Sequence, residues 1–398
     1  MTRSVSIVQR RLTHYRLPLF ERMRSSLQAE GVVLRLLHGQ PTASERSKHD
    51  EGQLPWAEPL ATRYWLDGNL CWQPFLRQTA GSDLVIVTQE NKLVNNLLAL
   101  ARPWRAGQLA FWGHGRNLQA QRPDGALEHF KRWTSPRVDW WFAYTELSAR
   151  LVREDGVPAS RITVLNNSID TTDLRRAIAL ARQTPRAALR ASLGLPPDGP
   201  LAVFVGSLYA DKRIPWLLRA ADAIQARLPG FQMVIAGEGP DKALVDAAAA
   251  RTPHLHALGG VRGARKAQLL AAADLMLNPG LVGLGILDAL VAGLPMLTTD
   301  CGLHSPEIAY LQSGDNGLMT ADDLASYVAA VVQLLQDPVQ ALRLQAGALR
   351  AGELYSIEHM ADRFCAGILD CLRQGRPGWH NPPPAPGPCH PNLDNKPS

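Results

Sequence analysis

The sequence lacks several features that mark common classes of protein. None of its apolar runs reaches the roughly 18 residues that a transmembrane helix requires. Its first residues, MTRSVSIVQRRL, lack the apolar core of a signal peptide. The five cysteines are scattered without the spacing of a metal site, which favours reduced thiols. We therefore expect a cytoplasmic protein whose 398 residues form two domains.

Motifs for several functions are also missing. The first predicted strand, Ser4–Val8, is followed by QRRLTHYR and no glycine fingerprint, which argues against an NAD dehydrogenase. No nucleic-acid-binding motif is recognisable, so we expect no nucleic acid partner. No Asp-x-Asp pair stands at a strand end to hold a divalent ion. No pair of carboxylates has the pattern of a two-step glycosidase. We expect neither a metal nor another cofactor.

The positive charge of the chain is confined to its first part. Residues 1–170 carry 22 Lys and Arg against 16 Asp and Glu, whereas the remainder carries 20 of each. A basic half can meet an anionic acceptor or an anionic membrane surface. An arginine-rich composition explains the same excess without any partner. Peripheral contact with the inner membrane face is therefore one of two interpretations of this charge.

A glycine-rich segment, Leu277 to Asp300, has the pattern of a strand, a loop and a helix start. Gly280, Gly283 and Gly285 leave the loop almost without side chains, so its backbone can approach a ligand closely. The free N–H groups and positive dipole end of the helix favour phosphate. Asp288, one turn into the helix, can accept hydrogen bonds from a ribose diol. Taken alone, this stretch fits a plain βα turn equally well.

Strand and helix patterns alternate along most of the chain, which predicts an α/β protein with two doubly wound, Rossmann-like domains. Ligands bind beyond the carboxyl ends of such strands, so we expect the domains to face each other across a cleft. Residues 170–198 are predicted to contain one helical segment and a Pro-Pro-Asp-Gly linker. The expected organisation is an N-terminal acceptor domain at 1–168, a hinge at 169–199, a C-terminal donor domain at 200–356, a helix at 357–374 crossing back to the N-terminal domain, and a disordered tail at 375–398.

Polar groups follow two of the predicted strands in the first half. His114 stands between two glycines directly after the strand Gln108–Trp112, where it can approach a substrate closely. Arg116 beside it can meet a phosphate. A histidine in this position is otherwise a structural residue. The candidate acceptor contacts after the two strands are His14, Tyr15, Arg16, Arg116 and Asn117.

Four motifs of the second half resemble those of the retaining, nucleotide-sugar-dependent glycosyltransferases of family 4, which have the GT-B fold. They are VGSLYADKRIPWLLRA, VIAGEGPDKALV, AAADLMLNPGLVGLGILDALVAGLPMLTTD and CGLHSPEIAYLQSGDNGLM. The resemblance covers most of residues 1–372 and is strongest over 201–320. In the first half, YRLPLF and WGHGRN fit members that act on envelope or exported polysaccharides.

This resemblance implies a role for individual residues. Lys212 would contact the donor diphosphate, and Asp288 would hold the ribose. His114 would lie near the sugar and phosphate, which completes the expected catalytic set. Backbone N–H groups of Gly285, Ile286 and Leu287 would bind the phosphates, and Glu238 and Val261 would lie near the base. The expected donor-binding residues are Gly206, Ser207, Arg213, Glu238, Val261, Gly280, Gly283, Gly285, Ile286 and Leu287.

The sequence departs from the family pattern at three positions. Gly280 replaces the first glutamate of the E-x7-E motif, and Asp288 replaces the second with a side chain one methylene shorter. Ser207 stands where the family has an arginine, and Arg213 or Arg116 could supply the missing positive charge. These changes leave the sugar and the level of activity open.

The implied function is retaining, metal-independent transfer of a sugar, as in a hexosyltransferase, from a nucleotide-sugar donor to a glycan or lipid-linked acceptor. The pathway would be envelope or exopolysaccharide synthesis. Two alternatives remain at this point. One is a GT-B nucleotide-sugar epimerase, and the other is a catalytically weak scaffold that binds sugar nucleotides.

Overall fold

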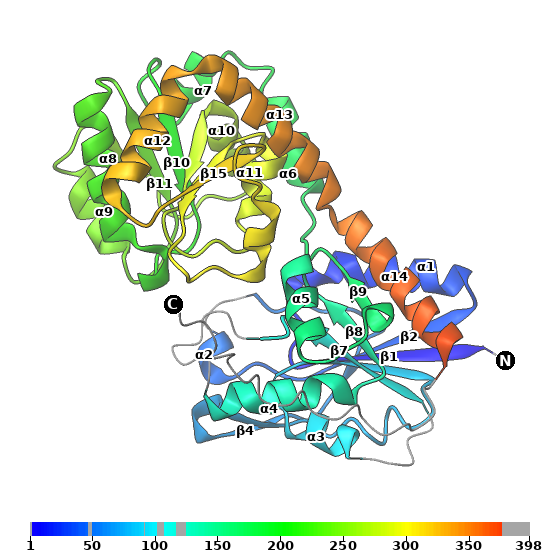
Figure 1. Ribbon diagram of the computed structural model, residues 1–398. Coiled ribbons are helices and arrows are strands. Elements are labelled where there is room, and N and C mark those ends of the chain that lie inside the picture. The colour runs from blue at the N-terminus through cyan, green and yellow to red at the C-terminus, as the bar shows by residue number, and fades with distance from the viewer. Residues whose placement is uncertain (1, 47–49, 91, 102–106, 117–124, 376–398) are drawn as a thin grey trace, which may run out of the picture.

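The chain folds into two α/β lobes, each built around a parallel sheet (Figure 1). The computed structural model describes residues 2–46, 50–90, 92–101, 107–116 and 125–375. All statements below concern these residues. Both sheets are buried on both faces, in line with their nearly continuous apolar strands.

The sheet of the first lobe has the strand order β3-β2-β1-β6-β7-β8-β9, and every pairing in it is parallel. A separate antiparallel pair, β4-β5, lies in the region between β2 and β6. The strands are β1 (Arg3–Gln9), β2 (Val32–His38), β3 (Glu58–Pro59), β4 (Arg63–Trp65), β5 (Leu70–Trp72), β6 (Leu84–Thr88), β7 (Gln108–Gly113), β8 (Trp140–Ala143) and β9 (Ile162–Val164).

The sheet of the second lobe has the order β12-β11-β10-β13-β14-β15, again with parallel pairing throughout. In both sheets the order reverses at one point, between β1 and β6 in the first and between β10 and β13 in the second. The strands are β10 (Leu201–Val205), β11 (Gln232–Ala236), β12 (Leu255–Ala257), β13 (Leu275–Leu277), β14 (Met296–Thr299) and β15 (Gly317–Thr320).

Helices cover the faces of both sheets. Polar caps begin several of them: Thr145 accepts a hydrogen bond from Ser148 N, Asp323 from Ser326 N, and Ser356 from His359 N. The α-helices are α1 (Leu17–Ala29), α2 (Ala43–Arg46), α3 (Val94–Leu100), α4 (Ala126–Thr134), α5 (Glu146–Glu154), α6 (Thr172–Ala181), α7 (Arg186–Ser192), α8 (Ile214–Arg227), α9 (Lys242–Ala249), α10 (Gly263–Ala272), α11 (Ile286–Ala292), α12 (Leu324–Gln336), α13 (Pro338–Leu354) and α14 (Ile357–Gln374).

The last helix, α14, belongs to the core of the first lobe although it follows the second lobe in sequence. Figure 1 shows α13 and α14 running from one lobe to the other, with α14 lying beside α1. Phe364 of α14 packs edge-on against Trp112 of β7 and stacks on Phe142 of β8. Within the described residues the chain therefore crosses between the lobes twice, before α6 and before α14.

One detail differs from the sequence-based expectation. Residues 170–198 form two helices, α6 and α7, because Pro185 breaks the segment and starts the second helix.

Candidate functional site

The candidate site lies at the reversal point of the second sheet, where β10 and β13 pair side by side. Open parallel sheets bind ligands beyond the carboxyl ends of their strands at such a point. Two loops leave these strands: residues 206–213 after β10 and residues 278–285 after β13. The first contains a short 3-10 helix, η5 (Ala210–Lys212).

Lys212 joins the two loops. Its Nζ donates to Leu281 O at 2.5 Å, and Leu281 N donates back to Asp211 O at 2.8 Å. Burial lowers the pKa of Lys212 to about 8, with a smaller opposing effect from Asp211. The ammonium group is thus charged at neutral pH and already close to the glycine loop.

Gly280 lies against the backbone of η5. A Cβ atom at this position would come within 2.3 Å of Asp211 O and 2.8 Å of Lys212 O. These neighbours are main-chain atoms that cannot rotate away. The glycine at the place of the family's first glutamate is therefore required by packing in this backbone, and a glutamate side chain does not fit there.

The first half of the glycine loop is fixed by side chains from β14 and from the segment after it. Pro279 O accepts from Thr299 Oγ1 at 2.9 Å. Val282 N donates to His304 Nδ1 at 3.1 Å, while His304 Nε2 lies 2.8 Å from Thr299 O. Because a carbonyl only accepts, Nε2 carries the proton. His304 is therefore a neutral tether between the loop and β14.

The second half of the loop has free backbone donors. Within the described part of the chain, the N–H groups of Gly283, Leu284 and Gly285 have no hydrogen-bond acceptor. Those of Ile286 and Leu287 donate to Gly283 O and Leu284 O, both at 3.0 Å. Three consecutive free N–H groups are suited to an anion. The available donors thus begin two residues earlier than the resemblance implies, and only Gly285 is common to both sets.

Asp288 is buried one turn into α11 and pairs with Lys266 of α10. Its Oδ2 lies 2.6 Å from Lys266 Nζ, whereas its Oδ1 is buried without a hydrogen-bond partner. Burial raises the pKa of Asp288, and the charge and hydrogen bond of Lys266 oppose that rise. A buried acceptor without a donor is costly, so a ligand hydroxyl that reached Oδ1 would relieve this cost.

The remaining donor-side candidates line the same edge of the sheet. Ser207, after Gly206, is exposed at the end of β10. Glu238 is exposed after β11, and its Oε1 accepts from Gly260 N at 2.9 Å. Val261 follows Gly260 in the sequence. Its side chain is 9% exposed and belongs to the core, so it offers little surface to a nucleotide base.

The two arginines considered as substitutes for the missing arginine are both engaged. Arg213 has a left-handed backbone with φ of 56° and pairs with Asp322. Arg116 lies 2.6 Å from Asp155 and 3.0 Å from Glu154. A phosphate would have to displace carboxylates from either side chain, which makes both poor phosphate ligands in this arrangement.

The facing edge of the first sheet holds Arg16, His114 and Tyr144. Gly113 and Ala143 are register partners, so His114 and Tyr144 follow neighbouring strands, and their ring centroids are 4.3 Å apart. Part of the His114 side chain is exposed to solvent, but protein atoms lie around most of the imidazole. Their desolvation of the ring lowers the pKa of His114 to about 4, and the charges of Lys131 and Arg16 lower it further. His114 is therefore neutral at physiological pH. Arg16 is buried close by.

Contacts between the lobes lie beside these groups. Asn167 Nδ2 of the first crossing donates to Glu307 Oε1 at 2.6 Å, and Tyr310 Oη donates to Asn167 O at 2.9 Å. Glu307 and Tyr310 belong to a 3-10 helix, η6 (Pro306–Tyr310), that follows β14. Because β14 ends at the donor side, η6 brings the carboxyl edges of the two sheets together.

The remaining predicted acceptor contacts are His14, Tyr15 and Asn117. His14 is exposed, and its Nδ1 lies 3.2 Å from Asp50 O, with Tyr15 edge-on to its ring at 6.0 Å. Asn117 lies outside the described residues.

Comparison with known proteins identifies the chain. The family model for Glycosyl transferases group 1 matches residues 199–337. The D-inositol 3-phosphate glycosyltransferase of Rhodococcus opacus is 31% identical over 347 residues, which span 83% of this chain and 69% of that protein. The chain belongs to the group 1 glycosyltransferases. A phosphatidyl-myo-inositol mannosyltransferase of Mycolicibacterium smegmatis is 30% identical to this glycosyltransferase over 150 residues, 36% of this chain and 38% of that protein.

Solved structures confirm that the glycosyltransferase has the GT-B fold. HepE of Anabaena, solved in complex with UDP, superimposes with a TM-score of 0.66 at 15% identity, covering 92% of this chain and 99% of that one. Sucrose-phosphate synthase of Thermosynechococcus elongatus gives a TM-score of 0.65 at 16% identity, covering 94% and 98%. The predicted fold of two Rossmann-like domains is thus confirmed.

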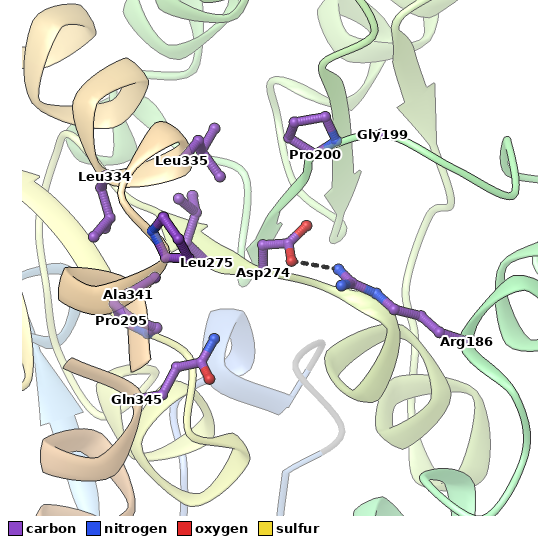
Figure 2. A pocket seen from close by; sticks show the side chains of 11 residues that line it. Arg186, Gly199, Pro200, Asp274, Leu275, Pro295, Leu334, Leu335, Ala341 and Gln345 are labelled. Atoms are coloured by element: carbon purple, nitrogen blue, oxygen red, sulfur yellow. Dashed lines mark ion pairs between the residues drawn. The ribbon is translucent and has the colours of Figure 1, made fainter. Parts of the chain in front are cut away.

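The glycosyltransferase also has a hollow at the opposite edge of its second sheet. Its volume is about 320 Å³, and it lies at the amino ends of β10, β13 and β14 (Figure 2). Its charged groups are already satisfied, because Asp274 pairs with Arg186 at 2.6 Å and accepts from Leu201 N at 2.8 Å. The hollow is distant from the strand ends that form the candidate site.

No three His, Cys, Asp or Glu side chains in the described ranges lie close enough together to hold a metal ion. None of the helices within those ranges has an apolar stretch long enough to span a bilayer.

Several residues of this glycosyltransferase site escaped the sequence analysis. Lys266, His304 and Glu307 gained no role because their partners are distant in sequence. Tyr144 could have been found, since aligning the predicted parallel strands places it beside His114. Glu307 stands within the family-like segment CGLHSPE, which was the available signal.

Proposed function

We propose that this glycosyltransferase moves a sugar from a nucleoside diphosphate sugar to a glycan or lipid-linked acceptor, with retention and without a metal ion, in envelope or exopolysaccharide synthesis. The observation that supports binding of a nucleotide-sugar donor is the cluster of groups at the β10-β13 reversal point. Three free backbone N–H groups, the ammonium group of Lys212 and the unpaired Oδ1 of Asp288 converge on one edge of the sheet.

The residues of this edge divide into phosphate and ribose contacts. The N–H groups of residues 283–285 and the ammonium group of Lys212 would bind the diphosphate. The N–H groups carry partial positive charge, and Lys212 Nζ already contacts the same loop at Leu281 O. Asp288 Oδ1 would accept a ribose hydroxyl, with Oδ2 held by Lys266. HepE, which has a similar fold, was solved in complex with UDP, and this supports a nucleotide as part of the donor.

The same groups would stabilise the leaving group. As the bond from the anomeric carbon to the diphosphate oxygen breaks, negative charge grows on that oxygen. Lys212 and preorganised N–H groups favour this charge without the cost of reorganising water. Retention would follow from attack by an acceptor hydroxyl on the same face, with the departing phosphate taking the proton. This last step rests on the family resemblance.

One observation favours a second candidate function, a sugar-nucleotide-binding scaffold with weak activity. Gly280 is packed against η5, so the glutamate that contacts the donor sugar in the family is absent and has no room. Binding of nucleotide would survive this loss, whereas positioning of the sugar would suffer.

The experiment is a calorimetric titration with UDP, GDP and ADP, followed by a turnover assay with the matching sugar nucleotide. Lys212→Ala is the test variant. Lys242→Ala is the matched control, because it removes one lysine from the exposed surface of α9. We expect one nucleotide class to bind wild type and Lys242→Ala, with at least tenfold weaker binding to Lys212→Ala.

The outcomes separate the candidates. Nucleotide release that depends on added acceptor supports the transferase. Release or conversion of the sugar nucleotide without acceptor indicates an epimerase or hydrolase. Binding without turnover favours the scaffold, and no binding of any nucleotide by folded protein contradicts all of them.

A further inference from the structure

Arg16 is a buried cation without a counter-ion. The residue is 6% exposed, and no carboxylate in the described part of the chain lies within the 4.0 Å of an ion pair from its guanidinium. Its hydrogen bond within that part is a weak one, from Nη1 to the sulfur of Met360 at 3.8 Å. Buried charges in proteins are normally paired, because removing an ion from water is costly. Arg16 departs from this rule beside the candidate site.

Aromatic rings surround the guanidinium, and its charge acts on the buried Glu307 without forming an ion pair with it. Its central carbon lies 5.1 Å from the ring centre of Trp112, 5.3 Å from Tyr15 and 5.7 Å from Tyr144. A cation over an aromatic face gains roughly 0.5–2 kcal/mol, which offsets only part of the desolvation. Among the described residues the weak contact with Met360 is the hydrogen bond of this guanidinium, so most of its N–H donors have no acceptor there.

Three further polar groups, one on Trp112 and two in the same row of the sheet, are unpaired among the described residues. The Nε2 of Gln9, the hydroxyl of Thr88 and the indole Nε1 of Trp112 are buried and have no hydrogen-bond partner. Thr88 and Trp112 are register partners, and Gln9 follows Val8, the partner of Val87. The three side chains therefore lie in one row on the same face, at the carboxyl ends of β1, β6 and β7.

This row stands at the reversal point of the first sheet, between β1 and β6. That is where an open parallel sheet binds its ligand. Gln9 and Trp112 carry N–H donors, and neighbouring His114 is neutral. Lys131, the other cation whose charge acts on His114, lies 3.5 Å from Glu128, whereas Arg16 has no ion pair among the described residues. Such a set of donors around one cation is complementary to an anion.

From this geometry we infer that Arg16, in its cage of Tyr15, Trp112 and Tyr144, binds an anionic group of the acceptor, either a phosphate or a carboxylate. Naming the ligand an acceptor rests on the proposed function; the anion site itself does not. The substrate class is thus a sugar, polyol or lipid headgroup that carries a negative charge.

Glu307 is the alternative partner for Arg16. It reaches this region from the second lobe, is buried, and pairs with Asn167. A shift of the lobes could bring its carboxylate to the guanidinium. If that were the function of Arg16, its removal would destabilise the protein, and an added anion would have no effect.

The test uses inorganic phosphate as the probe and the indole N–H resonance of Trp112 as the readout, assigned with Trp112→Phe. Chloride at equal ionic strength is the control. The Lys212→Ala background weakens phosphate binding at the donor loop. We expect a saturable shift in wild type and in Lys212→Ala, at least tenfold weaker binding in Arg16→Met, and partial retention in Arg16→Lys.

Thermal unfolding of the same samples distinguishes a binding role from a structural one. Without phosphate, Arg16→Met should unfold at the same or a higher temperature than wild type. In the Lys212→Ala background, phosphate should raise the midpoint when Arg16 is present and raise it much less when Arg16→Met is added. Glu307→Gln should retain phosphate binding. The inference would be overturned if phosphate did not shift the indole resonance in wild type, or if Arg16→Met showed the same shift as wild type. A large loss of stability in Arg16→Met would also overturn it. Phosphate binding at Arg16 without nucleotide binding would contradict the proposed function alone.

Discussion

Lys212 titrates near the pH at which the enzyme would work, because burial lowers its pKa to about 8. The charged form is the one that attracts a diphosphate. We predict that kcat/KM for the sugar nucleotide falls about tenfold per pH unit above about 8, since this ratio reports the free enzyme. A pH profile measures this. Lys212→Arg, whose guanidinium stays charged, should not show the fall. A wild-type profile that is flat two units above that pKa contradicts the assignment.

Asp288 and Lys266 depend on each other. Burial raises the pKa of Asp288 above its ordinary value, and Lys266 opposes this rise. We predict that Lys266→Met lowers the free energy of unfolding by roughly 3 kcal/mol at neutral pH, the cost of an uncompensated buried carboxylate. A carboxyl with a raised folded-state pKa binds its proton more tightly when folded, so stability is lost as pH rises through that pKa. The deficit should therefore shrink at acid pH.

Urea unfolding at neutral and acid pH measures this deficit. The double variant Lys266→Met with Asp288→Asn is the control, because it removes the buried charge and should recover much of the loss. An equal deficit at every pH would show that Lys266 contributes through packing of its side chain, not through its charge.

At the residue scale, the sequence identified positions better than partners. Lys212, Asp288 and His114 were found because each follows a predicted strand or opens a helix. The engagement of Arg116 with Asp155 and of Arg213 with Asp322 was not predictable. Arg116 and Asp155 are 39 residues apart in the sequence, and Arg213 and Asp322 are 109 apart. Tertiary packing decides which acid lies near each arginine. The assigned roles stay predictions until ligands are tested.

At the scale of the element, the glycine loop consists of two halves with different functions. Residues 279–282 are fixed by η5, Thr299 and His304, whereas the N–H groups of 283–285 are free. The sequence predicted the loop and α11 but not this division, because the division depends on η5 lying under Gly280. A rigid first half would preorganise the second half for an anion.

Gly280 provides a test of this packing. We predict that Gly280→Ala lowers the free energy of unfolding by about 1–3 kcal/mol, since its Cβ would lie 2.3 Å from Asp211 O. Gly283→Ala is the matched control, because its nearest neighbour would be 3.5 Å away and its backbone has no positive φ. Chemical denaturation of both variants measures the difference. Equal stabilities would mean that η5 yields readily and that the family's glutamate could be accommodated.

At the scale of the whole molecule, alternation of strands and helices was sufficient to predict two lobes and the GT-B fold. The contact between them was not predictable, since it depends on η6 and the crossing before α6. Asn167 is central to that contact: its Nδ2 donates to the buried Glu307, and its carbonyl accepts from Tyr310. This places the lobes so that their strand ends face each other.

We predict that Asn167→Asp loosens the contact between the lobes at neutral pH. The substitution replaces the donor 2.6 Å from Glu307 with a second acid. Burial already raises the pKa of Glu307, with the Asn167 hydrogen bond opposing, so the new pair would share a proton only at acid pH. Small-angle scattering should show a larger radius of gyration at neutral pH and a return toward wild type on acidification.

Asn166→Asp is the matched control for this prediction. It introduces the same charge one residue away, at a position with φ of 53° that Asp tolerates as well as Asn. Within the described residues no hydrogen bond joins the Asn166 side chain to Glu307, so the radius of gyration of Asn166→Asp should match that of wild type. If both variants expanded equally, added charge at the crossing would be the cause. If neither did, the remaining contacts at the crossings, such as the hydrogen bond from Ser168 Oγ to Tyr355 O at 2.7 Å, would suffice to hold the lobes.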